Sequence, residues 1–526
     1  EQTYRRRETE SMIAKNFDVE TLQSEQLGFG LIPDPIFTNA NEFQIISYIS
    51  RINYNYAGKY NLTFSYRADG SSKFEDPWGF FPSAAFSWNI NREKFLRNSN
   101  TISNLKLRMS YGQTANQGVP AYVNLSLMGN TNYVLDDTAV TGLSVVQLGN
   151  PDLTWEKTHS YDLGLDYGMF DGRIRFVADL YYKKTFDLLL NEPLPMSTGF
   201  SNKWSNIGEV ENRGIELILN TVNVDSKDFT WETEFTFSKN DNKILDLGAV
   251  EEELFRDQFS NGQFSGIMRV GEQLGTWYGY ETAGIFSYDD FQTDVDGNPL
   301  IENGYPVVKE DLGVYPTSTR AANPQDANNN PIPFYGDVKY VDQNGDGLIT
   351  PEDRVIIART QPKHYGGIFN KFTYKGFELG VFFTYKYGFD VVNGNTYRMN
   401  RLGQNNSNRP DIYNDVWTPL NPDASMPRAD YNEQTITDRN VEDGSYIRLQ
   451  SLNISYNLPN KYAKKIGVSS FKIYTNIDNI KVWTKYSGYD PEVSVSSGQR
   501  AVIMPNLDYG AYPRTTSIAL GLRVGL

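Results

Sequence analysis

The stretch YNLTFSYRADG, residues 60–70, decides the fold because its side chains alternate in polarity. Large apolar side chains occupy every second position: Tyr60, Leu62, Phe64 and Tyr66. Polar side chains fill the positions between them: Asn61, Thr63, Ser65 and Arg67. Successive side chains of an extended chain point to opposite faces, so this stretch predicts a strand with one apolar and one polar face.

The same alternation recurs along the rest of the chain. It is clear in NLKLRMSYG (104–112), RIRFVADLYYKK (173–184), TWETEFTFSKN (230–240), KGFELGVFFTYK (375–386) and the closing SIALGLRVGL (517–526). No sustained helical periodicity competes with it. We predict an all-β protein with about thirteen strands after residue 43 and one more before residue 10.

Short and long connections alternate strictly between these strands. The short ones are residues 57–58, 91–103, 168–172, 223–228, 375–376 and 459–467. The long ones are polar and rich in Gly, Asn and Pro, at residues 68–82, 113–158, 185–212, 241–364, 388–444 and 479–515. Tight turns at one end of antiparallel strands and large loops at the other are typical of an outer-membrane β-barrel, with periplasmic turns and extracellular loops.

Two soluble β architectures compete with this interpretation. A β-sandwich would also alternate, but it rarely has strands this long, aromatic residues massed toward strand ends, and loops so unequal in length. A propeller or solenoid would show a repeat of fixed length, and none is visible. The barrel therefore accounts best for the pattern.

Composition excludes several functional classes. The chain of 526 residues has no Cys, two His and a net charge of -15. These counts exclude disulfides and thiolate zinc sites and disfavour a His-based metal centre, because His159 and His364 are far apart in sequence. The acidic balance argues against nucleic acid as a ligand. No run of eighteen apolar residues exists and no signal peptide opens the chain, so we expect a processed or partial chain without a transmembrane helix.

An ordered series of motifs resembles one known family. It includes GFFPSAAFSWNINREKFL (79–96), NPDLTWEKTHSYDLGLD (150–166), NIGEVENRGIEL (206–217), YIRLQSLNISYNLP (446–459) and YPRTTSIALGLRVGL (512–526). With these motifs the chain resembles SusC/RagA-type TonB-dependent outer-membrane transporters of the Bacteroidetes, from about residue 60 to its end.

The resemblance implies that residues 1–526 are the C-terminal portion of a transmembrane antiparallel β-barrel with long extracellular loops. About 14 strands of a larger, 22-stranded barrel are then present, and the N-terminal plug and the first strands are absent from this chain. Barrels of this kind usually end in an aromatic residue, whereas the last residue here is Leu526. This departure leaves open whether Leu526 is the true terminus.

The resemblance also implies a function. We expect an active importer of oligosaccharides or peptides in the outer membrane of a Gram-negative Bacteroidetes cell, not an enzyme and with no required cofactor. Its expected partners are a SusD-like surface lipoprotein, the TonB–ExbB–ExbD complex and outer-membrane lipid. The alternatives are a passive porin and a surface binding protein that contains calcium turns. The sequence assigns no substrate-binding residue.

The stretch VDQNGDGLITPED, residues 341–353, has the spacing of a calcium loop. Its candidate ligands are the side chains of Asp342, Asn344, Asp346 and Asp353 and the carbonyl of Leu348, at positions 1, 3, 5, 12 and 7. Gly347 at position 6 permits the sharp turn. The sequence around it predicts extended chain before the loop and one helical turn after it, so a bound calcium ion would be a structural staple and no sensor. The alternative is a turn held by side-chain to backbone hydrogen bonds without metal.

Two further sets of residues invite a functional interpretation. Asp490 and Glu492 could be taken for a glycosidase pair, but carboxylates one residue apart in a loop are better explained as turn formers. Aromatic residues of the predicted loops could stack on a sugar or a peptide: Trp78, Tyr122, Trp204, Tyr335 and Trp417. Packing within the loops is the better explanation for each of them. We expect the aromatic residues of the strands, such as Tyr60 and Phe383, to face lipid.

Overall fold

The computed structural model describes most of the chain. The described residues are 1–11, 14–17, 30–33, 37–257, 263–302, 304–309, 333–400, 414–429, 431, 435–498 and 500–525. Leu526 lies outside them. By its internal contacts the chain forms two compact units, residues 1–93, 106–163 and 181–211 in one and residues 94–105, 164–180 and 212–526 in the other.

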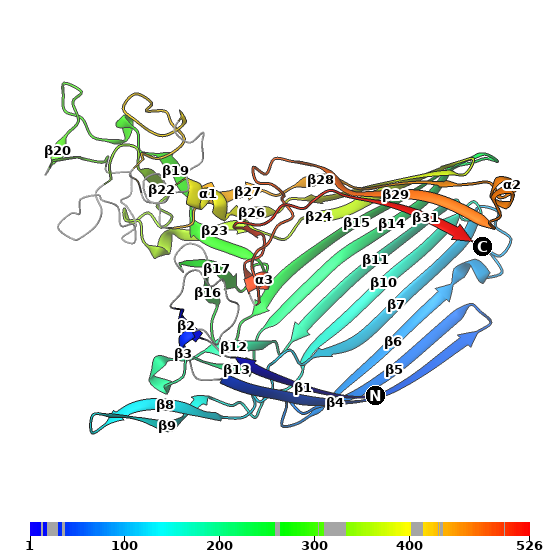
Figure 1. Cartoon of the computed structure of the whole chain (residues 1–526), viewed down its shortest axis with the longest axis horizontal. Helices are drawn as coiled ribbons and strands as arrows, with labels where there is room; N and C mark the ends of the chain where they lie inside the picture. The colour runs from blue at the N-terminus through cyan, green and yellow to red at the C-terminus, as the bar shows by residue number, and fades with distance from the viewer. Residues whose placement is uncertain are drawn as a thin grey trace. The chain divides into compact units, whose positions relative to one another are not determined.

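One sheet of fourteen strands dominates the fold (Figure 1). Its order is β1 (Gln2–Ser11), β4 (Phe37–Tyr56), β5 (Tyr60–Ser71), β6 (Trp78–Asn89), β7 (Ile102–Asn116), β10 (Glu156–Met169), β11 (Ile174–Phe186), β14 (Glu209–Asp225), β15 (Phe229–Asp246), β24 (His364–Tyr374), β25 (Phe377–Tyr387), β28 (Tyr446–Asn457), β29 (Ser470–Thr484) and β31 (Ser517–Gly525). Along this order the strands follow one another in the chain. The predicted strand before residue 10 and the thirteen after residue 43 are all present.

The alternation of short and long connections is confirmed. Residues 57–59, 170–173, 226–228 and 375–376 link their strands tightly, whereas 117–155, 247–363 and 388–445 form long insertions. One predicted boundary is wrong: the connection expected at 68–82 is only residues 72–77. Antiparallel pairing carries β5 through Gly70 and β6 through Gly79, because the cross-strand ladder outweighs the weak strand preference of glycine.

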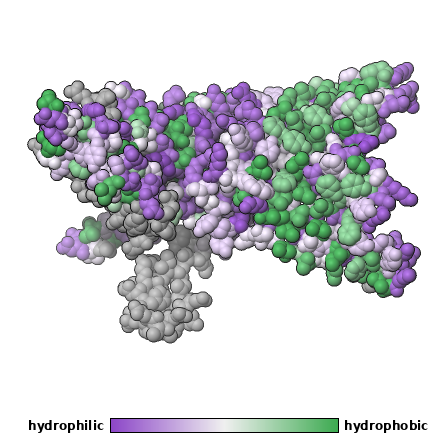
Figure 2. Space-filling model, turned by 90° about the horizontal axis from the view of Figure 1, so that it is seen from above, coloured by the Kyte–Doolittle hydropathy of each residue, from purple (hydrophilic) through white to green (hydrophobic). Residues whose placement is uncertain are grey.

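The two faces of the sheet differ in polarity. On β31 the side chains of Ile518, Leu520 and Leu522 are 68%, 81% and 64% exposed. Figure 2 shows such apolar side chains gathered over the strands, with hydrophilic residues beyond them at the turns. An exposed apolar face of this extent is unfavourable in water and suits a lipid environment.

The long insertions carry smaller elements of their own. These are the strands β2 (Ala14–Phe17), β3 (Gly30–Pro33), β8 (Leu127–Leu135), β9 (Thr138–Gln147), β12 (Leu189–Pro193), β13 (Asn202–Asn206), β16 (Glu252–Arg256), β17 (Phe264–Arg269), β18 (Thr276–Tyr280), β19 (Thr282–Ile285), β20 (Ile301–Glu302), β21 (Tyr305–Pro306), β22 (Val338–Tyr340), β23 (Arg354–Arg359), β26 (Asp390–Asn393), β27 (Val441–Asp443) and β30 (Leu507–Asp508), and the helices α1 (Gly394–Met399), α2 (Asn460–Ala463) and α3 (Arg500–Ile503). A buried cluster that includes Tyr280, Phe291 and Tyr340 holds the largest insertion together. Within the described residues, none of the helices has the length and hydropathy to cross a bilayer.

Candidate functional site

The polar face of the sheet is the surface on which hydrophilic side chains meet, and it is the candidate functional surface. Alternation places it opposite the exposed apolar face: on β28, Ile447 is 55% exposed on the apolar side and its neighbour Arg448 is buried on the polar side. On β25 the same alternation puts Lys386 beside Arg448, because Thr384 pairs with Arg448 and Lys386 with Tyr446. The strand pattern therefore brings two cations to one place.

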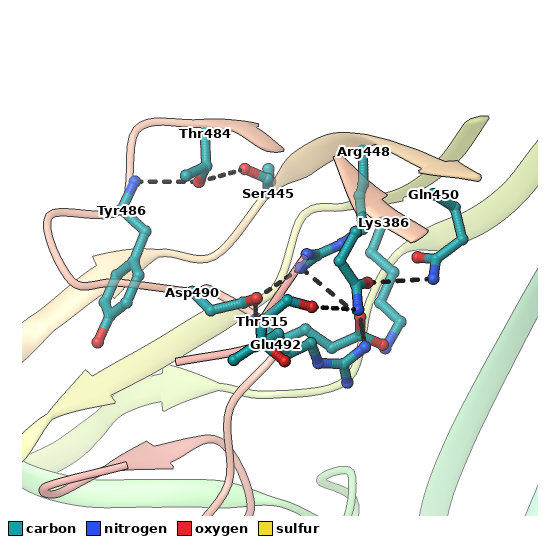
Figure 3. A network of polar contacts seen from close by, with 11 residues as sticks. Lys386, Ser445, Arg448, Gln450, Thr484, Tyr486, Asp490, Glu492 and Thr515 are labelled. Atoms are coloured by element: carbon teal, nitrogen blue, oxygen red, sulfur yellow. Dashed lines mark hydrogen bonds and ion pairs between the residues drawn. The ribbon is translucent and has the colours of Figure 1, made fainter. Parts of the chain in front are cut away.

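Acidic side chains from another part of the chain meet these cations (Figure 3). The segment that follows β29 supplies Asp490, whose Oδ1 lies 2.6 Å from a guanidinium nitrogen of Arg448. Glu492 in the same segment accepts from Lys386 at 3.1 Å and from Arg514 at 3.0 Å. We call these five residues the Arg448 network.

The Arg448 network fastens residues 485–516 to the polar face. Arg448 is 3% exposed and its Nε is buried without a hydrogen-bond partner, so this guanidinium is held by its terminal nitrogens alone. The network contains three cations and two carboxylates, which leaves an excess of one positive charge on the polar face. Such an excess attracts anionic groups of a polar solute.

The positions of Asp490 and Glu492 show that their interpretation as turn formers was incomplete. Asp490 does accept the N–H of Glu492 at 2.8 Å, as in a turn. Both carboxylates, however, are also engaged in ion pairs with Lys or Arg. Glycoside hydrolysis needs an acid and a base on opposite sides of a scissile bond, and this arrangement does not offer it.

A second polar hollow lies in the unit formed by residues 1–93, 106–163 and 181–211. It has a volume of about 560 Å³ and is lined by Arg51, Arg67, Asp69 and Trp155 among others. The Nε of Arg67 donates to Asp69 at 2.6 Å, and Asp69 is buried. The sequence did not single out these residues; the one available signal was that Arg51 and Arg67 occupy polar positions of strands that are otherwise aromatic on the other face.

The mouth of this hollow is fixed by a half-buried lysine. Lys73 donates to the carbonyl oxygens of Val119 at 2.6 Å and Gln117 at 3.1 Å. Burial lowers the pKa of the Lys73 ammonium. Because both acceptors precede the long insertion that contains β8 and β9, Lys73 anchors the start of that insertion.

The loop aromatics mostly pack within the loops. Trp417 is 7% exposed, and its ring stacks on Tyr335 with centroids 6.4 Å apart. Trp204 packs against the buried cluster around Trp155. Gly336 lies under Trp417 with φ of +79°, and a Cβ at this position would stand 2.6 Å from the ring, so the contact requires glycine.

Trp78 and Tyr122 do not follow this rule. Trp78 begins β6 and is 40% exposed on the apolar face, where it stacks on Tyr48 with centroids 6.0 Å apart. This position suits an interfacial aromatic ring better than a loop contact. Tyr122 has φ of +68°, and its hydroxyl accepts the N–H of Glu42 at 3.3 Å.

The calcium-like stretch forms a turn stabilised by its own acidic side chains. Asp342 accepts the N–H groups of Gly345 and Gly347, both at 2.7 Å, and these bonds, that from Gly347 above all, lower the pKa of the Asp342 carboxyl. Asp346 accepts from Leu348 at 2.8 Å and Asn344 accepts from Asp346 at 2.9 Å. The expected extended chain before the loop is β22, and the expected helical turn after it is the 3₁₀ turn Pro351–Asp353.

Asp353 has a different role from the other acids of this stretch. It is fully buried and accepts the N–H groups of Gln343 at 2.9 Å and Thr350 at 2.6 Å, which closes the loop and caps the 3₁₀ turn. In the described part of the chain no three His, Cys, Asp or Glu side chains gather closely enough to hold a metal ion. The structure thus places the predicted ligands in one loop but engages them with backbone donors. Calcium binding here stays a prediction.

Comparison with known proteins gives one consistent family. The family model described as "TonB dependent receptor-like, beta-barrel" matches residues 16–480. The TonB-dependent receptor P3 of Formosa agariphila is 34% identical over 97% of this chain and 48% of its own length. The TonB-dependent receptor SusC of Bacteroides thetaiotaomicron is 28% identical over 91% of this chain and 43% of its own length.

The solved structures agree on the fold. The structure titled "Structure of the RagAB peptide transporter" superposes with a TM-score of 0.75 at 24% identity, over 99% of this chain and 52% of that one. The present chain therefore spans about half the length of the curated relatives and solved chains that it matches.

Proposed function

The chain belongs to the family of TonB-dependent receptor-like β-barrels, and from this we propose that it forms the C-terminal part of an energised importer for oligosaccharides or peptides. The match over residues 16–480 is the observation that carries the proposal. The family consists of outer-membrane proteins, so the predicted outer-membrane location and the all-β barrel fold are confirmed. The relatives are named as receptors and none as an enzyme.

The two faces of the sheet support transport through the structure. The exposed apolar face suits lipid, whereas Arg448, Lys386 and Glu492 lie on the opposite, polar face. In a closed barrel every backbone group of a strand pairs with a neighbouring strand, which requires that the edges β1 and β31 be joined by further strands. We propose that the rest of the barrel, expected to have 22 strands, and a plug belong to the part that precedes these residues in the relatives.

The proposed partners follow from the relatives. The curated relative is named SusC, and the superposable structure bears the name of a two-component peptide transporter, RagAB. We propose that a SusD-like lipoprotein covers the long-loop end of this chain and that TonB–ExbB–ExbD supplies the energy. The insertion held by Tyr280, Phe291 and Tyr340 offers a folded surface for such a cap.

Uptake by the complete protein tests the proposal. Labelled oligosaccharides and peptides are presented to cells that carry the complete protein, with and without TonB and with the proton gradient intact or dissipated. Uptake should stop without TonB or gradient, while binding at the cell surface continues. Cells that lack the complete protein are the control for both readings.

A passive porin is the alternative that the same protein can exclude. A plugged importer reconstituted in a planar bilayer should show no large constant conductance. Steady conductance without any partner, together with uptake that ignores TonB, would contradict the proposal.

A further inference from the structure

The apolar face carries a groove at the long-loop ends of β24, β25, β28 and β29. Its floor is a row of cross-strand neighbours, in which Gly366 pairs with Tyr385, Tyr385 with Ile447, and Ile447 with Trp483. Ile447 and Trp483 are 55% and 49% exposed. The groove has a volume of about 500 Å³.

The hollow exists because one position of the row has no side chain. A Cβ at Gly366 would stand 2.1 Å from the carbonyl oxygen of Thr236, so the backbone itself excludes any larger residue. One step closer to the long loops, His364 stacks on Tyr387 with centroids 5.0 Å apart and forms the upper wall. The glycine thus leaves a slot between aromatic rings that is wide enough for a hydrocarbon chain.

Two lysines flank the groove on the same face. Lys481, Trp483 and Lys485 are alternate residues of one extended stretch, and Lys481 pairs across the strands with Leu449, on the same face as Ile447. Both lysines are exposed, and within the described residues neither ammonium has an acidic side chain at ion-pair distance. Asp443 also lines the groove, but its carboxylate accepts the N–H of Ser445 at 2.9 Å.

An unpaired lysine on a lipid-contacting face is unfavourable unless its head reaches an anion. Its flexible stem allows the ammonium of Lys481 to extend along the surface toward the level of Lys485. A phosphate held between the two ammonium groups would compensate both charges. Ser445 and Thr484 add polar groups at the same rim of the groove.

We propose that this groove binds one phosphorylated glycolipid of the outer leaflet. An acyl chain lies against Tyr385, Ile447 and Trp483, and a phosphate is held by Lys481 and Lys485. The groove is continuous with the apolar face that contacts lipid in an outer-membrane protein, which favours a lipid over a soluble ligand. The excess of two cations over one engaged carboxylate favours an anionic headgroup.

Lipid binding to the full-length protein tests the site. The protein, purified in a non-ionic detergent, is titrated with a purified acylated glucosamine disaccharide that carries two phosphates, and bound lipid is counted by native mass spectrometry. Its dephosphorylated form and phosphatidylethanolamine are the comparison lipids. The variant K481Q/K485Q should bind the phosphorylated lipid about 30-fold more weakly, because each basic residue contributes on the order of fivefold.

The matched control removes two charges from the other end of the same strands. Lys464 and Lys465 lie exposed in the short connection between β28 and β29, so K464Q/K465Q should leave binding unchanged. Equal affinity of all three proteins, or equal affinity for the dephosphorylated lipid, would overturn the proposal. So would an efficient cross-link between two copies of Ile447→Cys, because a second copy of the chain would then cover the groove.

Discussion

Arg448 and Asp490 form a buried ion pair, with a guanidinium nitrogen 2.6 Å from the carboxylate oxygen and 3% of the arginine side chain exposed. The pair joins the wall strand β28 to the segment that returns after β29. Exposed ion pairs contribute little to stability, but removal of one partner from a buried pair leaves an uncompensated charge. The position of residues 485–516 therefore depends on this contact.

The first prediction concerns that dependence. Asp490→Ala should release residues 485–516 from the polar face, at a cost of about 3 kcal/mol for the stranded guanidinium. Trypsin cleavage at Arg500, within the released segment, should become faster. The double variant R448M/D490L should restore resistance, because an apolar pair needs no compensation. Arg514→Gln is the control: its partner Glu492 keeps Lys386, and its 43% exposed side chain should be worth no more than about 1 kcal/mol. Unchanged cleavage in Asp490→Ala would show that other contacts hold the segment.

The sequence predicts the sheet but not this ion pair. Period-two alternation is a local signal, so strands such as β5 and β25 and the order of short and long connections can be predicted from neighbouring residues. Arg448 and Asp490 are 42 residues apart, and no local pattern relates a polar strand position to a loop acid. The error at residues 68–82 has the same origin, because pairing of β5 with β6 extends strands through Gly70 and Gly79.

The second prediction concerns Gly336. Gly336→Ala should displace Trp417 and loosen the packing around Tyr335, because the new methyl group meets the indole ring and the backbone is in the left-handed region. We expect the thermal unfolding of the large insertion to shift to lower temperature, read from the fluorescence of its tryptophans. Gly297→Ala is the matched control, since Gly297 has φ of +82° with nothing within 4 Å of a Cβ. Gly297→Ala should show only the backbone cost of about 1 kcal/mol. Equal shifts in the two variants would mean that the ring contact contributes nothing.

The third prediction is a pH dependence at the short-turn end. Glu93 accepts from the Lys59 ammonium at 2.7 Å and from the Tyr60 hydroxyl at 2.7 Å, and these bonds, that from Lys59 above all, lower the pKa of the Glu93 carboxyl to about 2. A lowered pKa in the folded state stabilises at pH values above the unfolded value of 4.5, and this contribution is lost as pH falls toward 2. Denaturant unfolding at pH 6 and at pH 2.5 should therefore differ less in Glu93→Gln than in the unmodified protein. Lys59→Gln should reduce the difference in the same direction. An identical pH profile for Glu93→Gln would contradict the role of this carboxylate.

The fourth prediction tests calcium at the turn around Gly347. If calcium binds, a chelator should speed protease cleavage near Asp346 in the unmodified protein, and added calcium should reverse the effect. The double variant D342A/D346A should be cleaved quickly with or without chelator. If the turn is held by backbone hydrogen bonds alone, the double variant should still be cleaved faster, because Asp342 accepts two N–H groups, but the chelator should change nothing in the unmodified protein. The chelator response is thus the measurement that separates a metal site from a turn.

The last prediction assigns the long insertions to the cell exterior and the short turns to the periplasm. Single cysteines report the assignment directly, because the chain contains none. Val295 and Leu420 are almost fully exposed in two different insertions, and Lys227 is exposed in the turn between β14 and β15. Lys227 is a better probe of the turns than Gly376, where a Cβ would stand 2.6 Å from the carbonyl oxygen of Asn457. In intact cells an impermeant maleimide should label Val295→Cys and Leu420→Cys but not Lys227→Cys. After the outer membrane is permeabilised, all three should react, which shows that the turn cysteine is chemically accessible. Labelling of Lys227→Cys alone in intact cells would invert the topology, and the capping partner and the lipid groove would then have to face the opposite side.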